Sequence, residues 1–184
     1  MQYIIVGTGG QGVLFASKVL GHIAMTRGES VLGSEVHGMA QRGGSVVSHF
    51  KVGGYASPLV KMGDADLILA FDQNEAARSL GFLKDGGALV VNVHDRKLWN
   101  NEPLKRYIEK RRIRVHTLEG YEILKEHMGG RFIYMNALIL GAMCGSGVGA
   151  PSFEEVKAAV AALSPAKFKA DNEKAVELGY EAVN

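Results

Sequence analysis

The sequence predicts an α/β fold, in which a mostly parallel sheet carries helices on both faces within a single domain spanning residues 1–184. Three observations predict this fold. Apolar runs typical of strands alternate with segments whose apolar residues recur at helical spacing. A glycine-rich turn separates the first apolar run from the first helical segment. The chain has 184 residues, of which 47% are hydrophobic and 22% charged, a composition typical of one globular core.

The first elements are a strand, a glycine turn and a helix. Residues 3–6 read Tyr-Ile-Ile-Val, a β-rich apolar run that predicts a buried strand. From Val13 the apolar residues recur three and four positions apart, which predicts a helix that ends near Gly28. Residues 30–32 predict a short second strand at most, whereas residues 46–52 alternate and predict a strand with one wetter face.

The remainder of the chain repeats the alternation of strand and helix. Residues 65–71 predict a central strand, and a helix over 74–83 is expected to close with a turn at Gly86-Gly87. Residues 132–143 are apolar nearly all round, which predicts a helix buried in the core or at an interface. The other predicted elements are strands over 88–93 and 113–118 and helices over 103–111, 119–127, 152–163 and 171–182.

The alternation breaks between residues 33 and 61, where GSEVHGMAQRGGSVVSHF occupies positions 33–50. This stretch is too polar for a core, and a loop of such length inside a compact domain is often functional. Arg42 precedes Gly43 and Gly44, so its guanidinium could fork onto a carboxylate or phosphate while the backbone bends beside it. The alternative is a plain turn into the next strand, with a solvated arginine.

The turn after the first strand carries a recognisable glycine pattern. Gly7, Gly9 and Gly12 fit G-x-G-x-x-G between a strand and a helix, which favours a Rossmann-like fold and an anion at the helix start. The alternative is that these glycines only let the helix pack closely on its strand. A dinucleotide site would also need an acidic residue at the end of the second strand, and neither Glu29 nor Glu35 ends a convincing one.

We expect the glycine turn and the polar loop to meet at the carboxyl edge of the sheet, where open α/β sheets bind ligands. Together they would receive a phosphate-bearing group or the surface of a partner. The predicted ligand-binding residues are Gly7, Gly9, Gly10, Gln11, Gly12, Arg42, Gly43 and Gly44, and the predicted interface residues are Glu35, His37 and Gln41.

No catalytic or metal-binding residue is predicted. His37 and His49 have only Glu35 as a nearby carboxylate, which is a poor metal set, and Ser34 lacks the surroundings of a catalytic nucleophile. Cys144 is the only cysteine, so this chain alone cannot supply the thiolates of an iron–sulfur cluster.

Charge and hydropathy limit the kinds of partner and the cellular location that we expect for this chain. The chain has 21 Lys plus Arg against 19 Asp plus Glu, and a net charge of +2 gives no reason to expect nucleic acid. No apolar run approaches a membrane span and the start lacks a signal-peptide pattern, which together with the single cysteine favours a cytoplasmic protein. The basic residues between 105 and 114 predict a solvated helix face or, alternatively, a docking site for an acidic partner.

Four stretches of the sequence resemble one enzyme family. They are IIVGTGGQGV at 4–13, GSEVHGMAQRGGSVVSHFKVG at 33–53, SPLVKMGDADLILAFDQNEAAR at 57–78 and RFIYMNALILGA at 131–142. They resemble the small, gamma-type subunit of 2-oxoacid:ferredoxin oxidoreductases, and SEVHGMAQRGGSV is most similar to the indolepyruvate-oxidising members. The likeness covers most of the chain, and the two glycine motifs in this order and spacing make it fairly specific.

The resemblance implies a subunit of a complex that oxidatively decarboxylates a 2-oxoacid, joins the acyl group to coenzyme A and reduces ferredoxin. Thiamine diphosphate, magnesium and the iron–sulfur clusters would lie on a larger partner subunit. Gly63-Asp64, with Asn92 further on, resembles the Gly-Asp-Gly…Asn signature of thiamine diphosphate sites, but Ala65 takes the place of the second glycine, so we reject that match here.

Several alternatives stay open. The 2-oxoacid could be pyruvate or 2-oxoglutarate, and the isolated chain could form a homodimer. A stand-alone nicotinamide oxidoreductase and a nucleotide-sensing regulatory domain are the alternatives from other functional classes.

Overall fold

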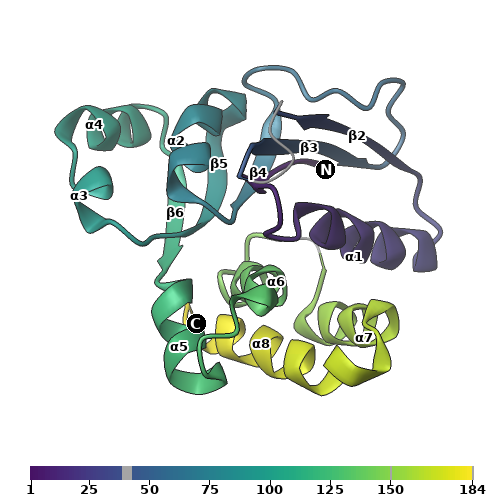
Figure 1. The fold of residues 1–184 in the computed structure, drawn as a ribbon. Coiled ribbons are helices and arrows are strands. Elements are labelled where there is room, and N and C mark those ends of the chain that lie inside the picture. The colour runs from purple at the N-terminus through teal and green to yellow at the C-terminus, as the bar shows by residue number, and fades with distance from the viewer. Residues whose placement is uncertain (39–42, 150, 184) are drawn as a thin grey trace.

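The computed structural model describes residues 1–38, 43–149 and 151–183 (Figure 1). A six-stranded sheet has the order β2-β3-β1-β4-β5-β6. The strands are β1 (Gln2–Thr8), β2 (Val31–His37), β3 (Ser45–Val52), β4 (Ala65–Ala70), β5 (Leu83–Asn92) and β6 (Arg114–Leu118). The helices are α1 (Val13–Thr26), α2 (Gln73–Ser79), α3 (Arg96–Trp99), α4 (Glu102–Lys110), α5 (Gly120–Met128), α6 (Met135–Gly145), α7 (Phe153–Leu163) and α8 (Lys169–Glu181), with single 3-10 turns η1 (Leu80–Phe82), η2 (Phe132–Tyr134) and η3 (Ala166–Phe168).

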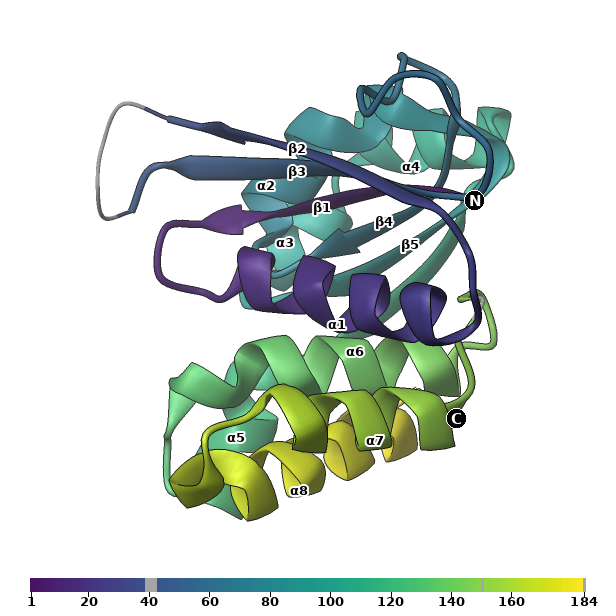
Figure 2. The same ribbon diagram turned by 90° about the vertical axis from the view of Figure 1, so that its right-hand side faces the viewer.

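Strands β1, β4, β5 and β6 pair in parallel, which confirms the predicted α/β fold. The inner residues of β1, β4 and β5 are buried on both faces, as is typical of continuous apolar runs in parallel sheets, whereas the edge strand β6 is mostly half-buried or exposed. One face packs on α1 and α6, and the other on α2, η1 and α4. Figure 2 shows α7 and α8 as a further layer on the side of α6 away from the sheet.

The edge of the sheet differs from expectation, because β2 and β3 form an antiparallel hairpin. The second strand was predicted to stop near residue 32, but β2 continues to His37 and pairs with β3 along its whole length. β3 in turn runs antiparallel to β1. Every residue of β2 is exposed or half-buried, so its sequence lacks the apolar run by which a buried strand is recognised.

A second correction concerns the segment after β4. The helix predicted over 74–83 is α-helical to Ser79 and continues as the 3-10 turn η1 to Phe82, and the predicted turn at Gly86-Gly87 lies within β5. The pairing of β4 with β5 shifts register between Ala65 and Leu67, and Gly86 has φ +75°. The two glycines therefore form an irregular start of a long strand, an arrangement that a turn-type dipeptide does not distinguish from a true turn.

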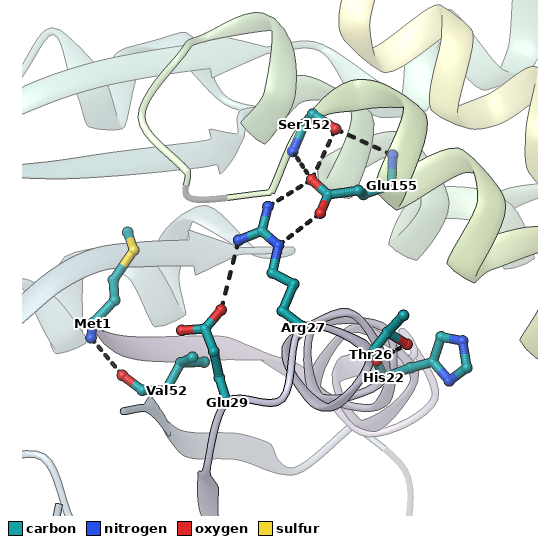
Figure 3. Close-up of polar contacts among 8 residues, drawn as sticks. All are labelled: Met1, His22, Thr26, Arg27, Glu29, Val52, Ser152 and Glu155. Carbon is teal, nitrogen blue, oxygen red and sulfur yellow. Dashed lines mark hydrogen bonds and ion pairs between the residues drawn. The ribbon is translucent and has the colours of Figure 1, made fainter. Parts of the chain in front are cut away.

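Close helix packing and an ion pair are among the contacts that join the outer helices to the rest of the domain. α6 and α8 approach so closely that a Cβ on Gly179 would lie 1.9 Å from the Leu138 carbonyl oxygen. At the C-terminal end of α1, the Arg27 guanidinium donates two hydrogen bonds of 2.6 Å to the Glu155 carboxylate (Figure 3). Glu155 also closes a capping box with Ser152 at the start of α7.

Helix α6 is buried along nearly its whole length and belongs to the core, whereas Phe132 and Ile133, at the start of the segment predicted as one helix, are exposed in η2. Within the described residues, no helix is both long and apolar enough to cross a membrane.

Candidate functional site

The glycine turn between β1 and α1 has a conformation that requires glycine. Gly10 and Gly12 have φ of +100° and +87°, values that L-amino acids with a side chain rarely adopt. A Cβ on Gly12 would also lie 2.3 Å from Nδ2 of Asn136, at the start of α6. The turn is therefore fixed by its own backbone and by the helix that packs beside it.

Gln11 holds this turn from inside. The amide of Thr8 donates to Oε1 of Gln11 at 2.7 Å, and Nε2 of Gln11 donates to the Tyr121 hydroxyl at 3.1 Å. Both ends of the side chain are thus engaged by the protein, which gives Gln11 a positioning role. Its predicted contact with a ligand stays a prediction.

The hairpin and the glycine turn meet at the carboxyl edge of the sheet. The amide of Gly9 donates to the Gly44 carbonyl oxygen at 2.8 Å, and the amide of Gly38 donates to the Ser45 carbonyl oxygen at 2.7 Å. Gly43 has φ +74°. The structure therefore brings together the two glycine segments that the sequence analysis placed at one edge. Gln41 and Arg42 lie outside the described residues.

A cavity of about 510 Å³ lies between the turn and the hairpin. Gly12, Val13 and Leu14 line it, so the first turn of α1 borders the cavity with its positive dipole end. No side chain caps this helix start among the described residues. The remaining lining residues are Thr8, Gly9, Gly10, His37, Gly38, Ser45 and Val46.

The charges next to the cavity are few. His37 lies at the end of β2 and is the titratable residue of the described lining. The Ser45 hydroxyl donates to the Glu75 carboxylate at 2.6 Å, and Arg78 contacts the same carboxylate at 2.5 Å. The Ser45 hydroxyl and the Arg78 guanidinium thus compensate the negative charge of Glu75 next to the cavity. The described part of the site offers backbone amides and a helix dipole, which suit an anion.

Glu35 is exposed on β2 and does not face β1, because β3 lies between the two strands. Glu29 lies at the opposite end of the sheet, where it pairs with Arg27 at 3.7 Å. Neither carboxylate can take the place of the ribose-binding acid of a dinucleotide fold, in which the second strand lies beside the first in parallel.

The sequence analysis named no residue of an apolar surface beside the glycine turn. Phe132 and Ile133 in η2 are 47% and 61% exposed, and the Phe132 ring meets the Tyr121 ring at 5.2 Å. Tyr121 in turn holds Gln11. Two large apolar residues directly ahead of the buried α6 could have indicated this surface, but the sequence analysis included them in the helix predicted over 132–143.

A metal-binding cluster and a reactive thiol are two further kinds of site to consider among the described residues. No group of three or more His, Cys, Asp or Glu residues there could hold a metal ion. Burial, with a smaller contribution from Glu155, raises the pKa of the Cys144 thiol to about 12, so this thiol stays protonated at neutral pH.

These features describe an α/β domain with a cavity that is lined by the glycine turn, the first turn of α1 and the β2-β3 hairpin. The chain belongs to the pyruvate ferredoxin/flavodoxin oxidoreductase family, whose model matches residues 2–182. The resemblance to the small subunit of 2-oxoacid:ferredoxin oxidoreductases is thereby confirmed.

Relatives of similar length carry the same likeness. The chain is 30% identical to the indolepyruvate oxidoreductase subunit IorB of Archaeoglobus fulgidus, over 98% of this chain and 94% of the relative. It is 32% identical to the same subunit of Pyrococcus horikoshii, over 97% and 94%.

Solved structures agree with the fold. The gamma subunit of the keto/oxoacid ferredoxin oxidoreductase of Geobacter sulfurreducens superposes with a TM-score of 0.75 and 27% identity, over 99% of this chain and 97% of that one. The 2-oxoglutarate:ferredoxin oxidoreductase of Magnetococcus marinus has the fold as 29% of a longer chain, with a TM-score of 0.65 and 17% identity.

Proposed function

We propose that this chain is the small subunit of a cytoplasmic 2-oxoacid:ferredoxin oxidoreductase that acts on an aryl pyruvate such as indolepyruvate. Family membership supports the reaction class, and the IorB relatives at 30% and 32% identity support the aryl substrate. Thiamine diphosphate, magnesium and the iron–sulfur clusters belong to the larger partner subunit in this proposal. One cysteine in this chain is consistent with that division.

We further propose that the cavity receives a phosphate-bearing part of coenzyme A. The observation that carries this proposal is the hydrogen bond from the Gly9 amide to the Gly44 carbonyl oxygen. It joins the glycine turn to the hairpin, and the cavity between them is bordered by the first turn of α1. Unpaired amides at a helix start favour an anion, and a cavity of about 510 Å³ has the size of a small-molecule site. The alternative occupant is a loop of the partner subunit.

Leu14→Glu tests the anion site, because Leu14 lines the cavity in the first turn of α1. A carboxylate is favourable at a helix start, so the fold is retained, but it repels a phosphate. In the assembled complex we expect the KM for coenzyme A to rise about tenfold, equivalent to roughly 1.4 kcal/mol. The KM for the 2-oxoacid should stay unchanged, and Leu14→Gln is the neutral control.

Two other outcomes are distinct. An unchanged KM for coenzyme A in Leu14→Glu removes the ligand from this cavity. Loss of assembly in Leu14→Glu but not in Leu14→Gln indicates that the partner's surface fills the cavity.

The substrate is tested separately, by comparing kcat/KM of the complex for indolepyruvate, pyruvate and 2-oxoglutarate. A preference for either of the last two contradicts the aryl assignment.

A further inference from the structure

A second surface, far from the cavity, is strongly basic. Residues 102–114 carry six basic residues against two acidic ones, an excess larger than the +2 of the whole chain. This segment forms α4 and the start of β6. Since β6 is the edge strand opposite to β2, and Arg114 begins it, the segment lies at the other side of the sheet and at the amino ends of its strands.

Part of this charge is compensated within the fold. Arg111 donates to the Asp85 carboxylate at 2.7 Å and to the Leu83 carbonyl oxygen at 2.6 Å, and Lys105 lies 3.6 Å from Glu102. Four further cations are exposed, and within the described ranges none of them has an ion-pair partner within 4.0 Å. We call these four the α4 patch: Arg106, Lys110, Arg112 and Arg114.

Arg112 occupies a backbone position that favours glycine. Its φ is +53°, and it is the one non-glycine residue with positive φ in the described part of the chain. The bond from the Ile113 amide to the Ile108 carbonyl oxygen (3.0 Å) and the bond from the Gly86 amide to the Arg111 carbonyl oxygen (2.8 Å) hold the turn in place. A cation at such a helix end is consistent with a role for its side chain, because strained residues cluster at functional sites.

The α4 patch is suited to a different kind of contact from the carboxyl edge. Permanent subunit interfaces are large and apolar, and the exposed Phe132 and Ile133 lie at the carboxyl edge. Beside the α4 patch, Tyr107 is the large apolar residue that is exposed, at 37%. A charged surface with little apolar area fits a brief encounter that charge accelerates, as in electron-transfer pairs.

We propose that the α4 patch docks an acidic electron-carrier protein, the ferredoxin-type acceptor of the complex. This inference rests on the function proposed above, and it adds that this small subunit contributes to acceptor docking. The charge of the patch and its distance from the apolar carboxyl edge carry the inference.

The test uses the complete complex with two electron acceptors. The triple variant Arg106→Glu, Lys110→Glu, Arg114→Glu reverses the α4 patch, and Lys61→Glu, Lys167→Glu, Lys169→Glu makes the same change in net charge on exposed residues elsewhere. With an acidic ferredoxin at low salt, we expect the patch variant to raise the acceptor KM about tenfold, and the difference to shrink in about 0.5 M salt. With methyl viologen, which needs no protein docking, both variants should match the wild type.

Arg112→Gly gives a second variant that is safe for folding, since glycine adopts the positive φ without strain. It should raise the ferredoxin KM about twofold to threefold while the Tm stays level or rises. An unchanged ferredoxin KM in the patch triple, or an equal change in the control triple, overturns the inference. Loss of the larger subunit from the patch triple also overturns it, since the surface would then be a subunit contact. A wild-type complex that reduces neither acceptor contradicts the proposed function itself.

Discussion

His49 is a buried histidine with a structural task. It is 7% exposed on β3, its Nδ1 accepts a hydrogen bond from the Val60 amide at 3.2 Å, and its ring meets the Phe82 ring edge-on at 5.4 Å. Burial, and then the charge of Lys51, lowers the pKa of His49 below its usual value. The sequence analysis rejected His49 as a metal ligand, and the structure explains its presence by this hydrogen bond.

The lowered pKa of His49 predicts an acid-sensitive fold. An unfolded histidine takes up a proton near pH 6.5, whereas His49 in the folded chain resists protonation to lower pH. The free energy of unfolding should therefore fall as the pH drops below about 6.5, toward the lowered folded pKa. His49→Asn keeps an acceptor and removes the titration, so its urea unfolding should depend less on pH between about 5 and 7.

The exposed His22→Asn is the control and should keep the wild-type slope. His116, whose pKa burial and Arg114 also lower, adds to the slope in the same direction in both variants. An identical slope in His49→Asn and wild type would contradict the assignment.

The residues of the candidate site were predictable to different degrees. The meeting of Gly9 and Gly44 was predicted from the rule that open α/β sheets bind ligands at their carboxyl edge, and Gly44 reaches this edge because β3 starts there, antiparallel to β1. The internal bond from Gln11 to Tyr121 joins residues 110 positions apart, and no local pattern encodes it. The same holds for the packing of Asn136 against Gly12, which only the docked α6 reveals.

At the scale of elements, the closest packing is between α6 and α8. A Cβ on Gly141 would lie 2.0 Å from the Val176 carbonyl oxygen, and one on Gly179 would lie 1.9 Å from the Leu138 carbonyl oxygen. These glycines let the two helices meet backbone to backbone, so α8 is tied to the buried α6.

Gly179→Ala should therefore be costly although alanine favours a helix. The added methyl group forces α8 away from α6, and we expect a loss of about 2–3 kcal/mol in the free energy of unfolding, measured by urea denaturation. Gly21→Ala in α1 is the matched control, because its Cβ would make ordinary contact with the Phe50 ring at 3.7 Å. That change should gain up to about 1 kcal/mol, and an equal loss in both variants would refute the packing argument.

The contact between α1 and α7 predicts a second acid effect. Hydrogen bonds from Arg27 and then from Ser152 lower the pKa of Glu155 to about 2. Because the ordinary value is 4.5, this stabilisation is present above about pH 4.5 and is lost as the pH falls toward 2.

Glu155→Gln keeps a capping side chain and removes the ion pair. Arg27 and Glu155 are about one-third exposed (34% and 35%), so solvent screens the pair and we expect a loss of about 0.5–1 kcal/mol at pH 7. The difference from wild type should disappear near pH 2 in chemical denaturation experiments. A difference that persists at pH 2 would show that packing, and not charge, is responsible.

The elements themselves were predicted where they are buried. The runs of β4 and β5 are apolar on both faces and were recognised from the sequence, except for the irregular start of β5. β2 was predicted only over its first residues, because an edge strand needs only one partner and little burial, and its residues 33 and 35–37 are exposed. Pairing with β3 defines this strand, and such pairing is invisible to local pattern.

At the scale of the whole molecule, two surfaces lie far apart. The cavity and the exposed Phe132 and Ile133 lie at the carboxyl edge of the sheet. The α4 patch lies at the amino ends of the strands, beside the edge strand β6. In Figure 1, α4 lies on the opposite side of the molecule from α1. The arrangement allows one large subunit and one smaller partner to be bound together.

Ile133→Glu tests the apolar part of the carboxyl edge. Ile133 is 61% exposed, so the change should leave the free chain folded, but it places a charge on the apolar surface of Phe132 and Ile133, which we propose as a contact with the larger subunit. We expect affinity for the larger subunit to fall at least about tenfold, measured by titration calorimetry. Met25→Glu, at 66% exposure on α1, is the matched control, and equal effects of the two changes would remove this surface from the contact.

The first strand begins with Gln2 and the last helix ends at Glu181, and in Figure 2 both chain ends lie at the side of the molecule away from the hairpin. Covalent joining of another subunit to either end would therefore leave the carboxyl edge open. The same fold can also be one segment of a longer chain, as in the Magnetococcus structure, where the matching part makes up 29% of the chain.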